Sequence, residues 1–472
     1  MRQLIGSDLD AVAAYAEDGQ GGAIPLQLVT AADCEALLQS LPQAQCRWAR
    51  AQGFAGQRHR LLMLPSQHGT FAAALWGLGE LPAPDALTAW DAAPLAERLP
   101  AGQYELARTL PAMTATQVCL GFLLGGYRFD RLRSPGSRSA AALVVPEGAD
   151  LRYAQAAATA MSLARDLINT PANHLGPAEL EAAVQQLVAD TAGAITVTSG
   201  EALTRDYPLI AAVGAGSARA ARLIDCRWPR PGAPKVTLVG KGVCFDSGGL
   251  DLKSSSAMLL MKKDMGGAAC ALALAHLLRA LDAPVELRLL IPAVENSVSG
   301  NAFRPGDVWR SRKGLTVEIG NTDAEGRLIL ADALADADAE QPDLLIDLAT
   351  LTGAARTALG PDLPAVFSPD ESLSRELAAL GAQHADPLWP MPLWRPYDEE
   401  LTSRVGDLNN ISASPFAGAI FAALFLQRFV STTRWLHVDL YAWNPKERPG
   451  RPLGAEAQCV RALYQLIRRL YG

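Results

Sequence analysis

The chain has 472 residues, of which 49% are hydrophobic and 19% are charged, so it has ample apolar surface to bury and is not globally disordered. Its formal net charge of −7 disfavours a general role in binding nucleic acids or membrane surfaces, because these polyanions are bound by clustered positive charge. The length exceeds what one hydrophobic core usually serves and predicts two domains.

Seven cysteines are scattered along the chain without a CxxC pair, which is typical of reduced thiols in a cytoplasmic protein. The first residues reach Asp8 and Asp10 before any sustained apolar run, so no signal peptide is predicted. Apolar stretches such as residues 417–425 are shorter than the roughly 20 residues that cross a bilayer. We therefore predict a cytoplasmic protein without a membrane span.

Residues 1–149 are predicted to form an N-terminal α/β domain without a catalytic constellation. Strand-like runs occur at residues 61–64 and 141–145, and helical patterns occur at residues 70–78 and 113–124.

Residues 150–168 form an alanine-rich helical segment that stops at Asn169-Thr170-Pro171. We predict that this segment is a helix connecting two domains.

Residues 169–472 alternate short aliphatic runs with helical patterns, which predicts an α/β domain with a mainly parallel central sheet flanked by helices. The predicted strands are residues 235–239, 286–291, 316–319, 344–348 and 435–440, and the helices are residues 268–280, 327–336 and 417–429. Ligand sites in such sheets lie on loops at the carboxyl ends of strands. The loops at residues 240–251 and 321–326 are therefore expected to share one site.

The first of these loops opens the segment VGKGVCFDSGGLDLKSSSAMLLMKKDMGGAA, which carries Lys241, Asp246, Lys253 and Asp264 on a glycine-rich backbone. Buried carboxylates are costly unless a cation or hydrogen-bond donors compensate them. Clustered acids on tight turns therefore indicate a metal site.

The second loop lies in IGNTDAEGRL, with Asp323, Glu325 and Arg327 at alternate positions. Alternate residues of an extended turn point the same way, so we expect these side chains to converge. If the two loops meet, four carboxylates share one pocket, and two divalent cations would offset their charge. Oxygen ligands suit Mn²⁺ or Mg²⁺ and tolerate Zn²⁺, so the metal stays open. Neither segment contains a histidine, which excludes an HExxH zinc site.

Each of these residues also has a simpler interpretation. A single Asp or Lys in a glycine-rich turn is most often a cap or a surface ion pair, but seven together favour a site. The GKG at residues 240–242 lacks the order of a phosphate-binding P-loop. Asp332, Asp336 and Asp338 are predicted to lie on a solvated helix face or at the helix end.

The two segments closely resemble the leucyl aminopeptidase (cytosol aminopeptidase) family through VGKGVCFDSGG, the lysine of LDLK, MKKDMGGAA and NTDAEGRL. The resemblance extends through NTPAN, SGNAFRPGDV, DLATLTGA and AGAIFAALFL, and it covers the chain from about residue 165. It implies that residues 169–472 are a catalytic metallopeptidase domain, and position alone assigns residues 1–149 to the family's smaller α/β domain. The implied enzyme is a dinuclear metallo-aminopeptidase that acts on peptides with a free N-terminus.

The resemblance also implies the metal ligands. Asp246 and Glu325 would bridge two divalent cations, Lys241 and Asp264 would complete the tighter site, and Asp323 would complete the more exchangeable one. Lys241 coordinates only as a neutral amine, and burial beside two cations would lower its pKa.

Two further residues take catalytic roles by resemblance. Lys253 would polarise the scissile carbonyl, and Arg327 would hold a bicarbonate ion as general base, helped by the helix N-terminus after Gly326. The substrate-binding residues implied by motif position are Met261, Thr350 and Gly353 around the first side chain, and Leu351, whose carbonyl would accept a substrate N–H.

Departures from the family pattern lie near the substrate. Ser254 stands where the family usually has proline. WLHVDLYAWN stands where the family commonly reads HLDIAG, so either Tyr441 replaces a small residue near the pocket floor or the loop is two residues shorter. Either change argues against assuming a preference for leucine.

Two alternatives remain beside the enzyme. Some members of the family bind DNA as hexamers, but DNA binding is disfavoured here because Arg47, Arg50, Arg58 and Arg60 form only a modest basic cluster. A catalytically dead scaffold is disfavoured because every expected ligand is present. The family resemblance implies a homohexamer.

Overall fold

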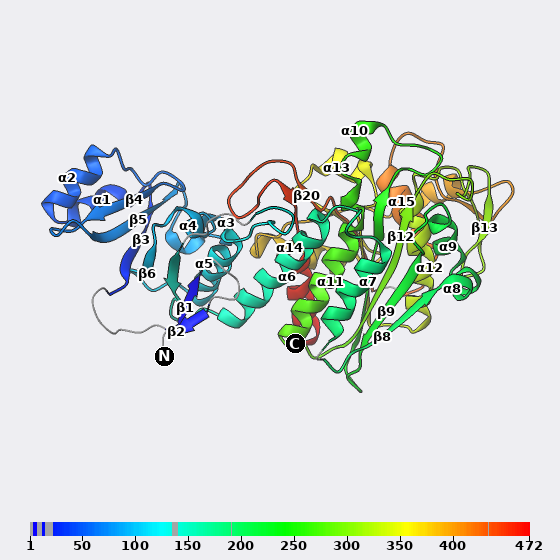
Figure 1. Cartoon of the computed structure of the whole chain (residues 1–472), viewed down its shortest axis with the longest axis horizontal. Coiled ribbons are helices and arrows are strands. Elements are labelled where there is room, and N and C mark those ends of the chain that lie inside the picture. Colours follow the sequence, from blue (N-terminus) through cyan, green and yellow to red (C-terminus); the bar gives the residue numbers. More distant parts are fainter. Residues whose placement is uncertain (1–2, 7–11, 15–21, 135–139, 190, 433) are drawn as a thin grey trace. The chain divides into compact units, whose positions relative to one another are not determined.

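The computed structural model describes residues 3–6, 12–14, 22–134, 140–189, 191–432 and 434–472. Asp8 and Asp10, on which the prediction of no signal peptide rests, lie outside the described residues. The chain divides into two compact units, one of residues 1–162 and 446–452 and one of residues 163–445 and 453–472. Helix α6 (Leu151–Asn169) begins in the first unit and ends in the second (Figure 1).

The first unit contains a mixed sheet of seven strands in the order β2-β1-β7-β6-β3-β5-β4. The central strand β3 pairs in parallel with both β5 and β6. The strands are β1 (Gln3–Gly6), β2 (Val12–Ala14), β3 (Ile24–Thr30), β4 (Leu61–Pro65), β5 (Phe71–Gly79), β6 (Gly102–Leu106) and β7 (Ala141–Val144). Helices α1 (Cys34–Ser40), α2 (Gln43–Ala51) and α5 (Ala112–Gly125) accompany the sheet.

The helix predicted at residues 70–78 is wrong, because this segment is strand β5. Its alanines and leucines give a helical pattern, but β5 lies between β3 and β4 and bonds to both. Pairing on two sides and burial of Leu75 and Trp76 override the local preference.

The second unit is built on a sheet of nine strands, eight in the order β17-β16-β19-β15-β10-β12-β9-β8, with β11 beside β12. The four central strands β19, β15, β10 and β12 run parallel to one another. β16 runs antiparallel to β19, β9 runs antiparallel to β12, and β8 runs antiparallel to β9. Their bounds are β8 (Ala194–Ser199), β9 (Arg222–Trp228), β10 (Lys235–Gly240), β11 (Gly242–Asp246), β12 (Glu286–Asn296), β15 (Leu344–Ala349), β16 (Ala365–Phe367), β17 (Trp389–Pro390) and β19 (Trp435–Asp439).

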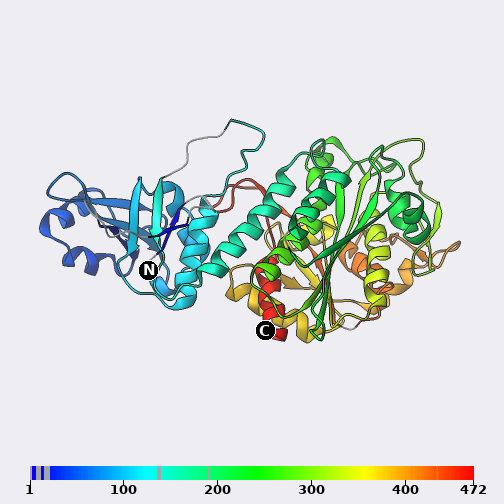
Figure 2. The ribbon, with the colours of Figure 1, turned by 60° about the horizontal axis from the view of Figure 1, so that its bottom comes forward.

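Helices cover both faces of this sheet (Figure 2). Helices α11 (Gly266–Ala280), α14 (Glu371–Gln383) and α16 (Val460–Tyr471) form one group, and α9 (Pro208–Gly214), α12 (Glu325–Ala339) and α15 (Gly418–Gln427) form the other. The central strands are buried on both faces, as a parallel sheet between helix layers requires. The predicted α/β class is confirmed.

The strand predicted at residues 316–319 exists as β14 (Thr316–Glu318), but its assignment to the central sheet is wrong. It pairs with β13 (Val308–Arg310) and β18 (Leu408–Asn409) in a separate small sheet. A run of three residues carries no information about which sheet it joins, and here the hairpin partner lies next in the chain.

The prediction that Asp332 is solvated is also wrong. Asp332 is fully buried in α12, where it accepts hydrogen bonds from the backbone N–H groups of Leu209 (2.8 Å) and Arg312 (2.7 Å). Asp338 does lie near the helix end and accepts from Ser431 and Thr432. The acidic face of α12 thus ties neighbouring loops to the helix.

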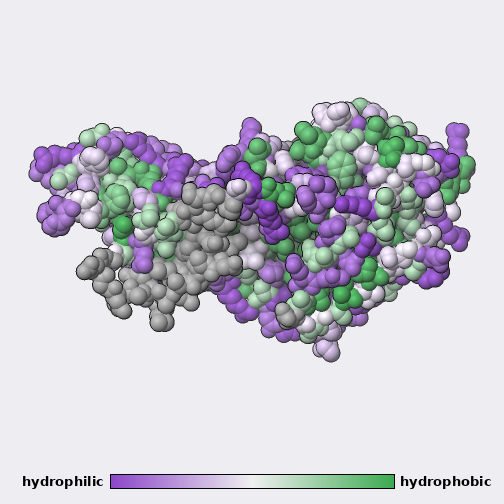
Figure 3. Space-filling model, in the orientation of Figure 1, coloured by the Kyte–Doolittle hydropathy of each residue, from purple (hydrophilic) through white to green (hydrophobic). Residues whose placement is uncertain are grey.

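The surface of the second unit drawn in Figure 3 intersperses hydrophilic and hydrophobic residues. Within the described part of the chain, the search for membrane-spanning segments finds no helix with the length and apolar character to cross a bilayer.

Candidate active site

Lys241 follows β10 directly, and the carboxyl end of this central strand places it inside the protein. Its Nζ lies 2.8 Å from Asp264 Oδ2 and 2.9 Å from Glu325 Oε1, and it donates to the carbonyl oxygen of Thr350 at 2.9 Å. Burial disfavours the ammonium, but the carboxylates of Asp264, Glu325 and Asp246 outweigh burial and raise the pKa of Lys241. By themselves these carboxylates favour the charged form of the lysine.

Asp246 is the last residue of β11, and both of its carboxylate oxygens contact neighbouring groups. Its Oδ1 accepts hydrogen bonds from the Asn296 side chain and the Gly248 N–H, each at 2.8 Å. Gly248 has a φ of +89°, which only glycine adopts without strain, so the tight turn after Asp246 depends on it. The other carboxylate oxygen lies 2.9 Å from Lys253 Nζ, which also pairs with Asp323.

The second segment reaches the same place through the start of α12. Asp323 lies in the loop before the helix, and Glu325 and Arg327 lie in the first turn. The predicted extended turn is therefore wrong beyond Asp323, since the helix begins at Glu325 rather than Arg327. Because Arg327 lies within the helical turn, its side chain does not point in the direction shared by Asp323 and Glu325.

Three carboxylates converge closely enough to hold a metal ion. One oxygen each from Asp246, Asp323 and Glu325 lies within 4.8 Å of the others. Burial and the neighbouring Asp246 carboxylate raise the pKa of Asp323 to about 6, and the same two causes raise the pKa of Glu325 well above its usual range. With all its acids ionised, the cluster would carry more negative charge than Lys241 and Lys253 offset, and its oxygen donors fit hard divalent cations.

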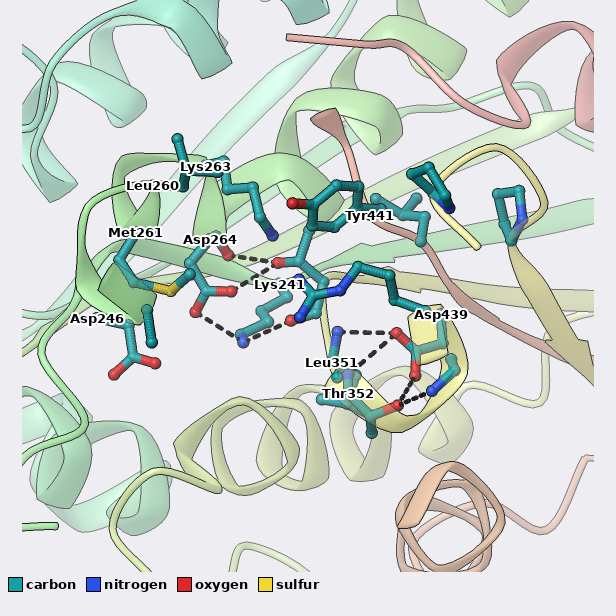
Figure 4. A pocket seen from close by; sticks show the side chains of 18 of the residues that line it. Lys241, Asp246, Leu260, Met261, Lys263, Asp264, Leu351, Thr352, Asp439 and Tyr441 are labelled. Carbon is teal, nitrogen blue, oxygen red and sulfur yellow. Dashed lines mark hydrogen bonds and ion pairs between the residues drawn. The ribbon is translucent and has the colours of Figure 1, made fainter. Parts of the chain in front are cut away.

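A cavity of about 430 Å³ opens beside this cluster (Figure 4). All the predicted site residues except Arg327 line it, namely Lys241, Asp246, Lys253, Met261, Asp264, Asp323, Glu325, Thr350, Leu351 and Gly353. The structure thus brings both segments and the loop after β15 to one place.

Arg327 is buried next to the cavity lining but outside it. Its Nη1 donates to the carbonyl oxygen of Asn410 at 2.5 Å, while its Nε has no hydrogen-bond partner among the described residues. Burial lowers the pKa of Arg327 to about 10. A buried guanidinium with an unused donor suits an anion.

Asn410 is a positioning residue that the sequence analysis missed. Its Oδ1 accepts from the N–H groups of Gly320 (2.7 Å) and Asn321 (3.2 Å), and its Nδ2 donates to the Asn321 carbonyl. It therefore fixes the loop that carries Asp323 and, through its own carbonyl, the Arg327 side chain. Asn410 lies almost ninety residues after Asn321 in the chain. The only signal for it in the sequence is its position after a polar turn.

Asp439 was also missed, although it lies near the end of a predicted strand, where ligand sites gather. It accepts hydrogen bonds from the N–H groups of Leu351 (3.0 Å) and Thr352 (3.1 Å) and from the Thr352 hydroxyl (2.6 Å). Figure 4 shows this carboxylate beside Leu351 and Thr352, joined to both by dashed lines. Asp439 thereby sets the shape of the loop that presents the Leu351 carbonyl.

Tyr441 lies in the cavity lining, beside two cationic side chains. The Lys263 Nζ is 4.7 Å from the centre of its ring and the Arg356 guanidinium carbon is 4.8 Å from it. Burial lowers the pKa of Lys263 to about 8. The departure from the family pattern at Tyr441 therefore faces the cavity.

Most of the arginines considered for DNA binding form ion pairs or hydrogen bonds within the protein. Arg50 pairs with Glu35, Arg58 pairs with Asp91, and Arg60 donates to the carbonyl of Gly53. These contacts argue against a free basic surface.

Comparison with known proteins agrees with this geometry. Residues 162–464 match the catalytic domain of the cytosol aminopeptidase family, and residues 24–146 match the N-terminal domain of M17 aminopeptidases. A probable cytosol aminopeptidase of Syntrophotalea carbinolica is 42% identical over 378 residues, which make up 76% of this chain and 76% of that protein.

Two solved structures share the whole architecture. The cytosol aminopeptidase of Coxiella burnetii has a TM-score of 0.91 at 43% identity, covering 96% of this chain and 99% of that one. The bottromycin maturation enzyme BotP in complex with Mn has a TM-score of 0.84 at 34% identity, covering 96% of this chain and 100% of that one. The match to the family's N-terminal domain falls within the stretch that the sequence assigned to that domain by position alone. The chain therefore belongs to the cytosol aminopeptidase family (M17), a family of metal-dependent aminopeptidases.

Proposed function

We propose that this enzyme removes single residues from the free N-termini of peptides with two divalent cations, held by Lys241, Asp246, Asp264, Asp323 and Glu325. The observation that carries the proposal is the convergence of the Asp246, Asp323 and Glu325 oxygens in a cavity that also holds Lys241 and Asp264. Asp246 and Glu325 would serve both cations. The chemistry that such a pair supplies when bound is Lewis-acid activation of water and of the scissile carbonyl.

Mn²⁺ is our first candidate for the metal, because BotP, a structural relative, forms a complex with Mn. Carboxylate oxygens also accept Zn²⁺ and Mg²⁺. Lys241 coordinates only as a neutral amine, and a cation beside it disfavours the ammonium form.

Lys253 is proposed to stabilise the charge that develops on the carbonyl oxygen. Burial disfavours its ammonium, but Asp246 and Asp323 outweigh burial and raise the pKa of Lys253 above its usual value. A charged donor fixed in the cavity wall stabilises a developing oxyanion without reorganising.

Arg327 is proposed to hold bicarbonate, which would act as general base. Support comes from its unused Nε donor and from the N-terminus of α12, a helix of 15 residues whose first N–H groups favour an anion.

Substrate binding is assigned to the remaining lining residues. Met261, Thr350 and Gly353 would surround the first side chain, and the Leu351 carbonyl would accept a substrate N–H. The support for this assignment is the loop that Asp439 holds at the cavity wall. We also propose a homohexamer, which light scattering at six times the 50.0 kDa chain mass would test.

The test is hydrolysis of aminoacyl-p-nitroanilides by the full chain. We expect activity that is lost on chelation, is restored by Mn²⁺, is absent with N-acetylated substrates and is lost in Glu325→Ala with an unchanged circular dichroism spectrum. Full activity after exhaustive removal of metal, or equal cleavage of the acetylated substrate, would contradict the proposal.

A further inference from the structure

Two cations face the cavity on either side of Tyr441. Lys263 comes from the short helix η2 (Met261–Met265) and Arg356 comes from α13 (Gly353–Leu359), and all three side chains line the cavity. Figure 4 shows the Lys263 side chain reaching towards the Tyr441 ring. The aromatic ring keeps both cations in the wall, at 4.7 and 4.8 Å from its centre.

Neither cation has a carboxylate partner among the described residues. Lys263 is only 5% exposed, and no hydrogen bond or ion pair involves its Nζ in the part of the chain that the structure describes. Lys263 lines the cavity, so its amine, which has no acceptor from the described part of the protein, is available to a ligand that supplies one.

The acids nearest to Lys263 are committed elsewhere. Asp264 lies 2.8 Å from Lys241 Nζ and accepts from the Thr350 hydroxyl. Asp439 accepts from the two N–H groups and the hydroxyl of the loop after β15. An incoming carboxylate would therefore find Lys263 and Arg356 unpaired.

The cavity lining also includes the apolar residues Leu260, Met261, Pro361 and Leu363. A side chain with a short aliphatic stem and an anionic end matches such a wall. A cationic side chain would meet two like charges, which excludes it by repulsion.

We propose that Lys263, Arg356 and Tyr441 select peptides whose first residue is glutamate or aspartate. This inference rests on the proposed aminopeptidase function and concerns the specificity of that same cavity. Lys263 and Arg356 act as substrate-binding residues, and Tyr441 acts as a positioning residue for both.

The experiment compares kcat/KM for glutamyl-, aspartyl-, leucyl- and lysyl-p-nitroanilide in the Mn²⁺-loaded enzyme. We expect the wild type to prefer the glutamyl over the lysyl substrate by at least about tenfold. Lys263→Met and Arg356→Met keep the aliphatic stems and should each lower the ratio of glutamyl to leucyl activity by about tenfold or more.

Lys262→Met is the matched control. Its Nζ donates to the Asn169 carbonyl at 2.5 Å and the residue is outside the cavity lining, so its ratio should equal that of the wild type. The inference would be overturned if the wild type preferred the lysyl substrate. It would also be overturned if the ratio of glutamyl to leucyl activity in both test variants stayed within twofold of the wild-type ratio. If Lys263→Met fails to fold, Arg356→Met decides alone. Absence of activity on every substrate would instead refute the proposed function.

Discussion

Gly326 lies against the side chain of Lys241, so closely that a Cβ built at position 326 would stand 2.4 Å from Lys241 Cε and 2.7 Å from its Nζ. The two motif segments pack this closely because the second residue of α12 has no side chain. Gly326→Ala should displace Lys241 from Asp264 and Glu325 and weaken binding at the tighter metal site.

We expect Gly326→Ala to raise the dissociation constant for Mn²⁺ by about tenfold or more, as losing a well-placed ligand does. Isothermal titration of the metal-free protein measures this constant. Gly300→Ala is a control, because a Cβ there meets nothing within 4 Å. Equal affinity in Gly326→Ala and wild type would show that Lys241 is not a ligand.

Lys253→Met should lower kcat about 100-fold or more while leaving the metal content at its wild-type value, because removing one oxyanion donor typically costs this much. Steady-state kinetics together with metal analysis of the purified variant checks both parts. A normal kcat would remove Lys253 from the chemistry.

Arg327→Ala should make the enzyme insensitive to bicarbonate. The guanidinium offers an unused buried donor, and nothing else in the first turn of α12 carries a positive charge. Wild-type kcat should rise with added bicarbonate in a buffer purged of carbon dioxide, whereas the variant should show a low, flat response. An equal response in both proteins would rule out Arg327 as the anion site.

Asp91→Asn should destabilise the N-terminal unit by about 2 kcal/mol at pH 7. Burial favours the protonated acid, but the nearby His59 ring, 3.8 Å away, and hydrogen bonds from Thr88 and Arg58 outweigh it and hold the pKa of Asp91 well below its usual value. A carboxyl with a depressed pKa stabilises the fold above its unfolded pKa, near 4, and loses this contribution as the pH falls below that value.

Calorimetry should therefore show that the free energies of unfolding of wild type and Asp91→Asn differ by a constant amount from pH 7 to about pH 5. This difference should become smaller below pH 4. A difference that grows as the pH falls would mean that the depressed pKa is not the cause.

Much of the second unit could be predicted because its strands are short aliphatic runs separated by turn signals, and the site loops follow directly after such runs. The candidate metal-binding segments could be identified because their acids lie on glycine-rich loops. Strand β5 could not be predicted, because its alanine-rich pattern is helical and only pairing with β3 and β4 decides its state.

The supporting residues escaped prediction for a different reason. Asp439 holds the Leu351 and Thr352 amides across almost ninety residues of sequence, and Asn410 holds Asn321 over a similar separation. Such contacts depend on how β15, β19 and the loop before α12 meet in space. A single Asp or Asn in the sequence does not indicate which distant loop it will contact.

In the proposed active site, five side chains would hold two divalent cations. Anomalous diffraction at the manganese absorption edge, on crystals grown with Mn²⁺, would locate both ions. We expect two peaks in the cavity, one contacted by Lys241 and Asp264 and the other by Asp323, with Asp246 and Glu325 contacting both. A single peak, or peaks away from these carboxylates, would contradict the dinuclear site.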